Sequence, residues 1–141
     1  MKGIRTLIKL AKQNLDVKRQ ELVQIQEKQD EYHAKNRQLE NELAQEKIRA
    51  RDLPPELNRF DIYLARVRDR QNSLRAAAQK LQPQIERLQG DITEAFAELK
   101  KFEILLEQKE KEEAEAEQKR ETIMLDEVAI ELYRRKQHEE S

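Results

Sequence analysis

The chain has 141 residues, of which 40% are charged and only 4% are aromatic, and its formal net charge is -1. It contains no cysteine, which excludes disulfides, thiolate nucleophiles and cysteine metal ligands. The sequence has no apolar run of 18 residues, and its first residues lack a signal-peptide core and cleavage site, so we expect a soluble intracellular protein.

Apolar residues recur at alternating steps of four and three between residues 4 and 106, and the pattern breaks only at Pro54-Pro55. A mean period of 3.5 residues places one narrow apolar seam on each of two long helices. We therefore predict an all-α protein, a single domain over residues 1–141, folded as an antiparallel two-helix coiled-coil hairpin with a longer, overhanging second helix.

The prolines set the predicted boundaries of the two helices. A residue before a proline avoids the helical region, and a proline is tolerated at the first position of a helix. We expect the first helix over about 3–52, the turn over about 53–56 and the second helix over about 57–137. Pro83 lies within the second helix and predicts a kink near residues 79–83.

Centring the turn on Pro55 pairs small residues with large ones across the seam. The resulting layers are Ala50 with Phe60, Tyr32 with Ala78, Leu15 with Ala95, and Ala11 with Leu99. Such pairs interdigitate without voids, although a slip by seven residues stays open. Five seam positions are polar: Lys18, Gln29, Asn36, Glu46 and Gln71. We interpret them as specifying the register, or adding flexibility, in preference to forming a site along the seam.

The second helix is predicted to extend beyond the end of the first. Ile4 faces Leu106, so residues 107–121 should form a solvated single helix with charge pairs such as Glu107–Lys111 and Glu115–Lys119. The overhang to residue 137 would extend about 45 Å.

Beyond the charged stretch, residues 123–133 are apolar on all sides of the predicted helix. The apolar side chains are Ile123, Met124, Leu125, Val128, Ala129, Ile130, Leu132 and Tyr133. Such a helix requires surrounding partners. We favour a docking tip that enters a partner protein; folding back on the hairpin and self-association are the alternatives.

The sequence has no recognisable catalytic, cofactor or metal site. It lacks a phosphate-binding glycine loop, His33 and His138 are isolated, and acidic runs such as Glu112-Glu113 have no pocket. Six of the first 20 residues are basic, but the lack of interleaved aromatic residues favours a protein partner over nucleic acid. We expect a protein that is not an enzyme.

Three stretches together resemble the family of the flagellar export protein FliJ: LIKLAKQNLDVKRQELVQIQ, ITEAFAELKKFE and KRETIMLDEVAIELYRR. The resemblance covers nearly the whole chain. Its more specific parts are the Leu125-Asp126-Glu127 element after a charged helix and a second helix longer than the first.

The resemblance implies a stalk similar to the central subunit of rotary ATPases. It implies association with the hexameric export ATPase FliI and the export gate protein FlhA, and a part in handling export chaperones. It also implies a cytoplasmic protein, peripheral at the cytoplasmic face of the inner membrane and in contact with that membrane only through the export apparatus.

Carried onto this sequence, the resemblance assigns two groups of docking residues. Those facing the ATPase ring are Ile123, Met124, Leu125, Asp126, Glu127, Val128, Ile130, Leu132, Tyr133, Arg5, Lys9 and Lys12. Those facing the export gate are Phe60, Ile62, Tyr63, Leu64 and Val67, of which Ile62 and Tyr63 lie off the seam. The alternatives are the equivalent stalk of a virulence type III secretion system and a generic coiled-coil spacer or adaptor.

Overall fold

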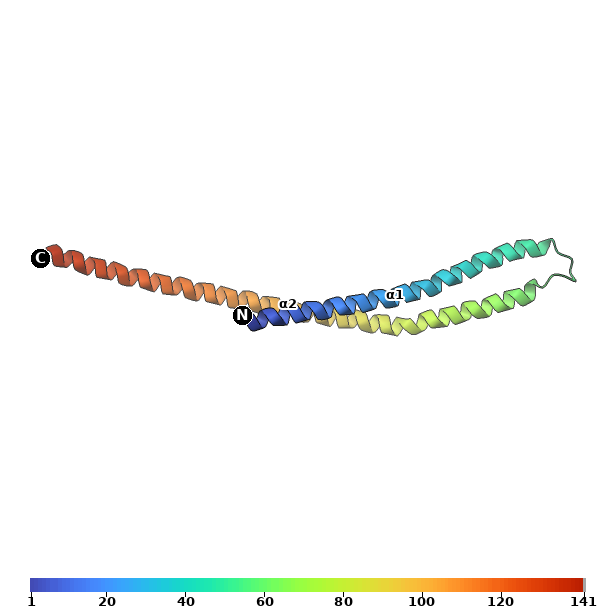
Figure 1. Cartoon of the computed structure of the whole chain (residues 1–141), viewed down its shortest axis with the longest axis horizontal. Helices are drawn as coiled ribbons and strands as arrows, with labels where there is room; N and C mark the ends of the chain where they lie inside the picture. The colour runs from blue at the N-terminus through green and yellow to red at the C-terminus, as the bar shows by residue number, and fades with distance from the viewer. Residues whose placement is uncertain (141) are drawn as a thin grey trace. The chain divides into compact units, whose positions relative to one another are not determined.

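The computed structural model describes residues 1–140, and two helices account for nearly all of them (Figure 1). Helix α1 spans Lys2–Arg51 and helix α2 spans Phe60–Glu140. No strand occurs among the described residues. The predicted all-α hairpin with a longer second helix is confirmed.

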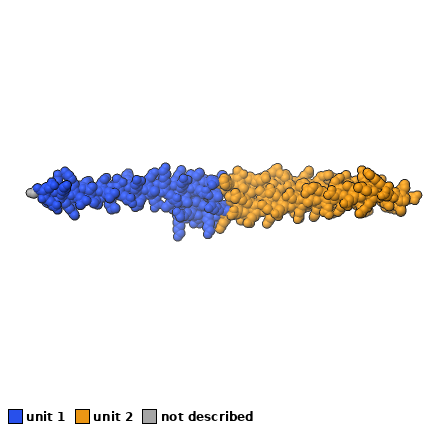
Figure 2. Space-filling view, turned by 90° about the horizontal axis from the view of Figure 1, so that it is seen from above, with its two compact units in different colours: residues 1–12, 97–141 blue, residues 13–96 orange. Residues whose placement is uncertain are grey.

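The chain divides into two compact units, which are coloured separately in Figure 2. Unit 1 consists of residues 1–12 and 97–141, and unit 2 consists of residues 13–96. Each unit contains part of α1 and part of α2, and unit 2 contains the turn that joins them (Figure 1).

The core of unit 2 is the predicted seam. Its buried apolar side chains are Leu15, Leu43, Val67, Ala78, Ile85, Leu88 and Ala95. Both members of one predicted layer are among them, Leu15 with Ala95. In unit 1, Ala11 and Leu99 of a second predicted layer are both buried. Removal of these side chains from water stabilises the packing of α1 on α2 in each unit.

One buried position of the seam is polar. Gln71 of α2 is only 1% exposed, and its Nε2 donates hydrogen bonds to the Glu40 carboxylate (2.8 Å) and the Asn36 backbone carbonyl (3.4 Å) of α1. Arg68 donates to the Glu40 carboxylate and to the Gln71 side-chain oxygen, both at 2.7 Å. Gln71 is therefore fully hydrogen-bonded, which offsets the cost of burying its amide.

Gln29 makes the corresponding hydrogen bonds from α1 to α2. Its Nε2 donates to the backbone carbonyl of Ala78 (3.1 Å) and to the side-chain oxygen of Gln82 (3.0 Å). Each glutamine thus inserts between two residues of the facing helix that are four positions apart, as a coiled-coil knob does. These contacts lie within one helical turn of the predicted register and support it over a slip by seven residues.

The turn is longer than predicted, because α2 begins at Phe60 and not near residue 57. The Pro54 carbonyl accepts hydrogen bonds from the N–H groups of Leu57 and Asn58, both at 3.0 Å, which forms a separate short turn. Asn58 then contacts both helices: its Nδ2 donates to the Ala50 carbonyl (3.4 Å), and its Oδ1 accepts from the Phe60 N–H (3.0 Å). Asparagine is a preferred residue before a helix for this reason.

Pro83 lies inside α2 without ending it. Proline removes the hydrogen bond that the carbonyl of Gln79 would otherwise accept within the helix. Both residues are exposed, so this carbonyl is accessible to hydrogen bonding by water. The kink near residues 79–83 stays a prediction.

The hydrogen bonds and burial of Gln71 lead to a prediction about the free energy of unfolding. Gln71→Ala should lower the free energy of unfolding by about 1–3 kcal/mol, because it leaves a cavity and removes the hydrogen bonds of the layer. Gln71→Leu should keep or raise that free energy, because a leucine fills the seam without burying a polar group. Denaturant unfolding of the three proteins checks this. A loss in Gln71→Leu as large as in Gln71→Ala would show that hydrogen bonding, and not volume, stabilises the layer.

The hydrogen bonds of the Glu40 carboxylate lead us to predict that the stability of the fold depends on pH. Hydrogen bonds from Gln71 and then from Arg68 hold the pKa of the Glu40 carboxyl below its ordinary value of 4.5. Because the folded pKa is the lower one, the ionised carboxylate stabilises the fold above about pH 4.5, and this contribution is lost as pH falls through the folded pKa. Glu40→Gln should make the melting temperature less sensitive to acid. Glu42→Gln, which removes an exposed carboxylate outside this layer, is the matched control.

Candidate functional site

The first candidate surface is the part of α2 that α1 does not cover in unit 1. Arg5, near the start of α1, forms an ion pair with Glu110 at 3.1 Å. From residue 107 to residue 140 every residue of α2 is exposed, whereas Phe102 and Leu106 are half-buried. In Figure 2 unit 1 correspondingly narrows to a single helix. The predicted overhang begins where the cover from α1 ends.

The charged part of the overhang contains ion pairs between residues three positions apart. Lys109 pairs with Glu112 at 3.8 Å, and Glu117 pairs with Arg120 at 3.6 Å. The predicted pairs Glu107–Lys111 and Glu115–Lys119 do not form in the described chain. The prediction was wrong in its partners because residues three and four positions apart are nearly equivalent neighbours on a helix.

Residues 123–133, which we call the docking segment, remain exposed throughout. Its seven large apolar side chains are between 51% and 68% exposed. Leu125, Val128 and Leu132 share one face of the helix by their spacing, and Ile123 and Ile130 share the opposite face. An exposed, contiguous apolar surface of this kind is typical of sites of interaction with other proteins.

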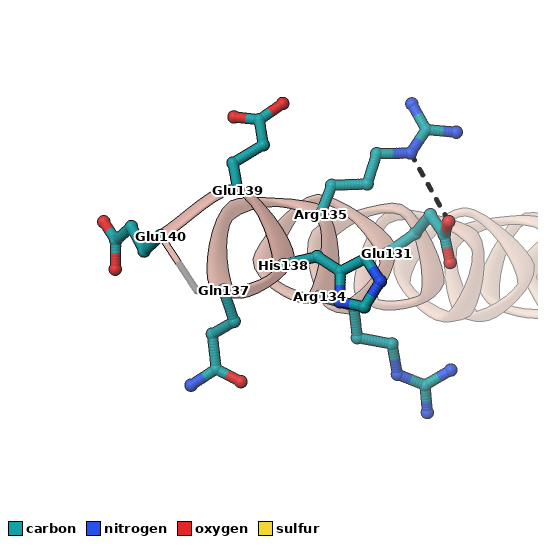
Figure 3. A pocket seen from close by; sticks show the side chains of 7 residues that line it. All are labelled: Glu131, Arg134, Arg135, Gln137, His138, Glu139 and Glu140. Atoms are coloured by element: carbon teal, nitrogen blue, oxygen red, sulfur yellow. Dashed lines mark ion pairs between the residues drawn. The ribbon is translucent and has the colours of Figure 1, made fainter.

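Charged side chains follow the docking segment at the end of α2. Figure 3 shows the side chains of Arg134, Arg135 and His138, with their neighbours, radiating outward from this last part of the helix. Arg135 pairs with Glu131 at 3.4 Å. A hollow here is lined only by residues 131–140 of this one helix, so it is an open groove between side chains and not an enclosed binding site.

The predicted ring-facing set separates into two places within unit 1. Arg5, Lys9 and Lys12 are exposed on α1. Arg5 reaches Glu110, which lies about 20 Å along the helix from Ile123. The structure therefore does not bring the basic side chains beside the docking segment, and a partner would have to contact both places separately.

The second candidate surface lies beside the turn in unit 2. Ile62 is 51% exposed, whereas Val67 is only 6% exposed and packs in the seam. Phe60, Tyr63 and Leu64 are half-buried, and the rings of Phe60 and Tyr63 lie 6.4 Å apart. Val67 is therefore a seam residue of the closed hairpin. Contact of these five residues with a gate protein stays a prediction.

Sequence reasoning missed exposed leucines in the turn itself. Leu53 and Leu57 are 47% and 64% exposed, and both line a shallow cavity with Phe60 and Tyr63. The second helix was predicted to begin near residue 57, which placed Leu57 inside it. Asn58 was the signal that could have corrected this, because an asparagine before an apolar run marks a helix start and leaves Leu57 outside the helix.

Residues 1–140 contain no group of three or more metal-ligating side chains of the kinds that hold an ion. None of the described helices is both long enough and apolar enough to span a membrane.

The model of one protein family, described as the flagellar FliJ protein, matches residues 1–138. No curated protein and no solved structure gives a significant match. The matched residues include both helices, the turn and the docking segment. The chain therefore belongs to the flagellar FliJ protein family.

Proposed function

We propose that this chain is a non-enzymatic stalk that docks into the hexameric ATPase of flagellar protein export and links it to the export gate. Its family makes it a component of the flagellar export apparatus. The ATPase would be a FliI-like protein and the gate an FlhA-like protein. The family match supports the flagellar apparatus over a virulence secretion system.

The exposed docking segment is the observation that carries the proposal. Each large apolar side chain gains about 1.5–3 kcal/mol when it moves from water into a packed interface. This segment has seven such side chains, which lie on opposite faces of α2 and are not buried by other residues of unit 1. A partner that surrounds the helix, such as the centre of a ring, buries more of them than a flat surface does.

The mechanism requires no chemistry from this chain. A helix that contacts several subunits of a ring at once stabilises the arrangement of subunits that it fits best. An effector changes activity only through such a difference in affinity between states. The docking segment would thereby favour ring assembly and ATP turnover.

The surface beside the turn would contact the gate. Its exposed apolar side chains are Leu53, Leu57 and Ile62, at 47%, 64% and 51% exposure. They lie in the turn or in the first turn of α2, outside the seam. Contact of these side chains with the gate would leave the docking segment of unit 1 free to bind the ATPase.

As a component of the export apparatus, the chain would work in the cytoplasm, at the face of the membrane that carries the apparatus. It would meet export chaperones there.

Deletion of residues 122–141 should abolish stimulation of the export ATPase, because it removes the docking segment. Steady-state ATP hydrolysis by the ATPase, measured with and without each protein, checks this. Unit 2 contains none of the deleted residues, so the truncated chain should remain helical. Full stimulation by the truncated chain would contradict the assignment and make Arg5, Lys9 and Lys12 the better candidates.

Ile62→Ala should weaken binding to the gate protein by about tenfold, the effect of losing roughly 1.4 kcal/mol at an interface. Binding kinetics measured with the purified gate domain immobilised on a surface check this. Stimulation of the ATPase by the variant should be unchanged. Ile104→Ala is the matched control, since Ile104 is similarly exposed (53%) but lies in unit 1, which does not contain the turn. Equal loss of gate binding in both variants would contradict the assignment.

A further inference from the structure

We propose that the docking segment also pairs with the same segment of a second copy of this chain, in an antiparallel arrangement. The inference rests on the order of charged and apolar side chains along one face of α2 in unit 1. Its consequence for regulation, given below, rests on the proposed function.

One face of α2 carries acidic, apolar and basic side chains in succession. Positions spaced by three or four residues share a face of a helix. Between residues 117 and 136 this face reads, in chain order, Glu117, Glu121, Leu125, Val128, Leu132, Arg135 and Lys136, and Glu139 follows one turn further on. The apolar stretch is therefore flanked by negative charge on one side and by positive charge on the other.

A face of this order is complementary to itself when one copy is reversed. If Leu125 lies opposite Leu132 of the second copy, Val128 lies beside its own equivalent at the twofold axis. The same register places Glu121 opposite Lys136. A parallel pair would instead place like charges opposite one another, which destabilises it. Antiparallel pairing is thus an isologous arrangement in which the contacts Leu125–Leu132 and Glu121–Lys136 each occur twice.

Nothing within unit 1 competes strongly for this face. Leu125, Val128 and Leu132 are 68%, 51% and 58% exposed. The pairs Arg135–Glu131 and Glu117–Arg120 each lie within one helix, and all four side chains are more than half exposed, so these pairs contribute little stability and can be exchanged.

Self-pairing and docking into a ring would exclude each other, because both bury the same side chains. The paired face has only three apolar layers, and interfaces of such limited area are weak and transient. The dimer would therefore protect the apolar segment in the absence of the ATPase and would dissociate when a ring offers a larger contact.

Cysteine cross-linking of the full chain tests the arrangement, because the chain has no cysteine of its own. Under mild oxidation, Val128→Cys should form a covalent dimer, since the two copies of residue 128 meet at the twofold axis. Glu121→Cys should not, because its nearest equivalent lies about 22 Å away along the helix, far beyond disulfide reach. A mixture of Glu121→Cys with Lys136→Cys should cross-link. Absence of a Val128→Cys dimer, or equal cross-linking of Glu121→Cys alone, overturns the proposal.

Exchange of charges tests the complementarity independently. The double variants Glu117→Lys/Glu121→Lys and Arg135→Glu/Lys136→Glu should each dissociate about tenfold more readily than the parent chain in sedimentation equilibrium. A one-to-one mixture of the two should recover the parent affinity, since each acidic face then meets a basic one. A mixture as weak as its components overturns the proposal. Lys119→Glu/Arg134→Glu, on the other side of the helix, is the matched control and should associate as the parent does.

These measurements use the chain alone, so their failure is distinguishable from failure of the proposed function. Ile123→Asp/Ile130→Asp places charges on the face opposite Val128 and should leave Val128→Cys cross-linking intact while reducing stimulation of the ATPase. Loss of both the Val128→Cys cross-linking and the stimulation of the ATPase in this variant would show that the two faces do not act separately.

Discussion

Contact between the apolar stripes of α1 and α2 is the constraint on which the rest of the structure depends. Neither helix carries enough apolar surface to be stable as an isolated helix in water, so each is ordered mainly by the other. The stripe is maintained where the partner helix is present and lost where it is absent. In unit 1 burial ends after Leu106, close to the position at which Arg5 of α1 reaches Glu110. The docking segment lies beyond this position on α2, and all of its residues are exposed.

Two glutamines give the seam its register at some cost in stability. Gln29 donates from α1 to α2, and Gln71 donates from α2 to α1, each to a backbone carbonyl and to a side chain four residues further on. A slip of either helix would separate both amides from their acceptors at once. Leucines at these positions would pack in several registers with similar energy. The one buried polar atom without a partner in the described chain, Oδ1 of Asn36, lies beside the Gln71 layer, which shows that the layer is not optimised for stability alone.

The sequence predicted the hairpin, its longer second helix and the polar seam positions because these depend on a period repeated over many residues. The start of α2 depends on two hydrogen bonds of Asn58, a local feature that a count of apolar positions does not detect. Val67 was assigned to the seam by its spacing and to the gate by resemblance. Its burial confirms the seam position, while its contact with a gate protein stays a prediction. The partners of the docking segment could not be predicted from periodicity, since an uncovered apolar helix requires burial but does not specify what buries it.

The two opposite faces of the docking segment explain how one helix could serve two partners in turn. A surface that only needed to enter a ring would gain nothing from an acidic stretch and a basic stretch on either side of Leu125, Val128 and Leu132. A surface that only needed to dimerise would gain nothing from Ile123 and Ile130 on the other side, where they add exposed apolar area. A weak homodimer covers one face and leaves the other exposed. A ring that contacts both faces therefore gains the apolar area that the dimer leaves in water, and this difference in buried area favours docking over self-pairing.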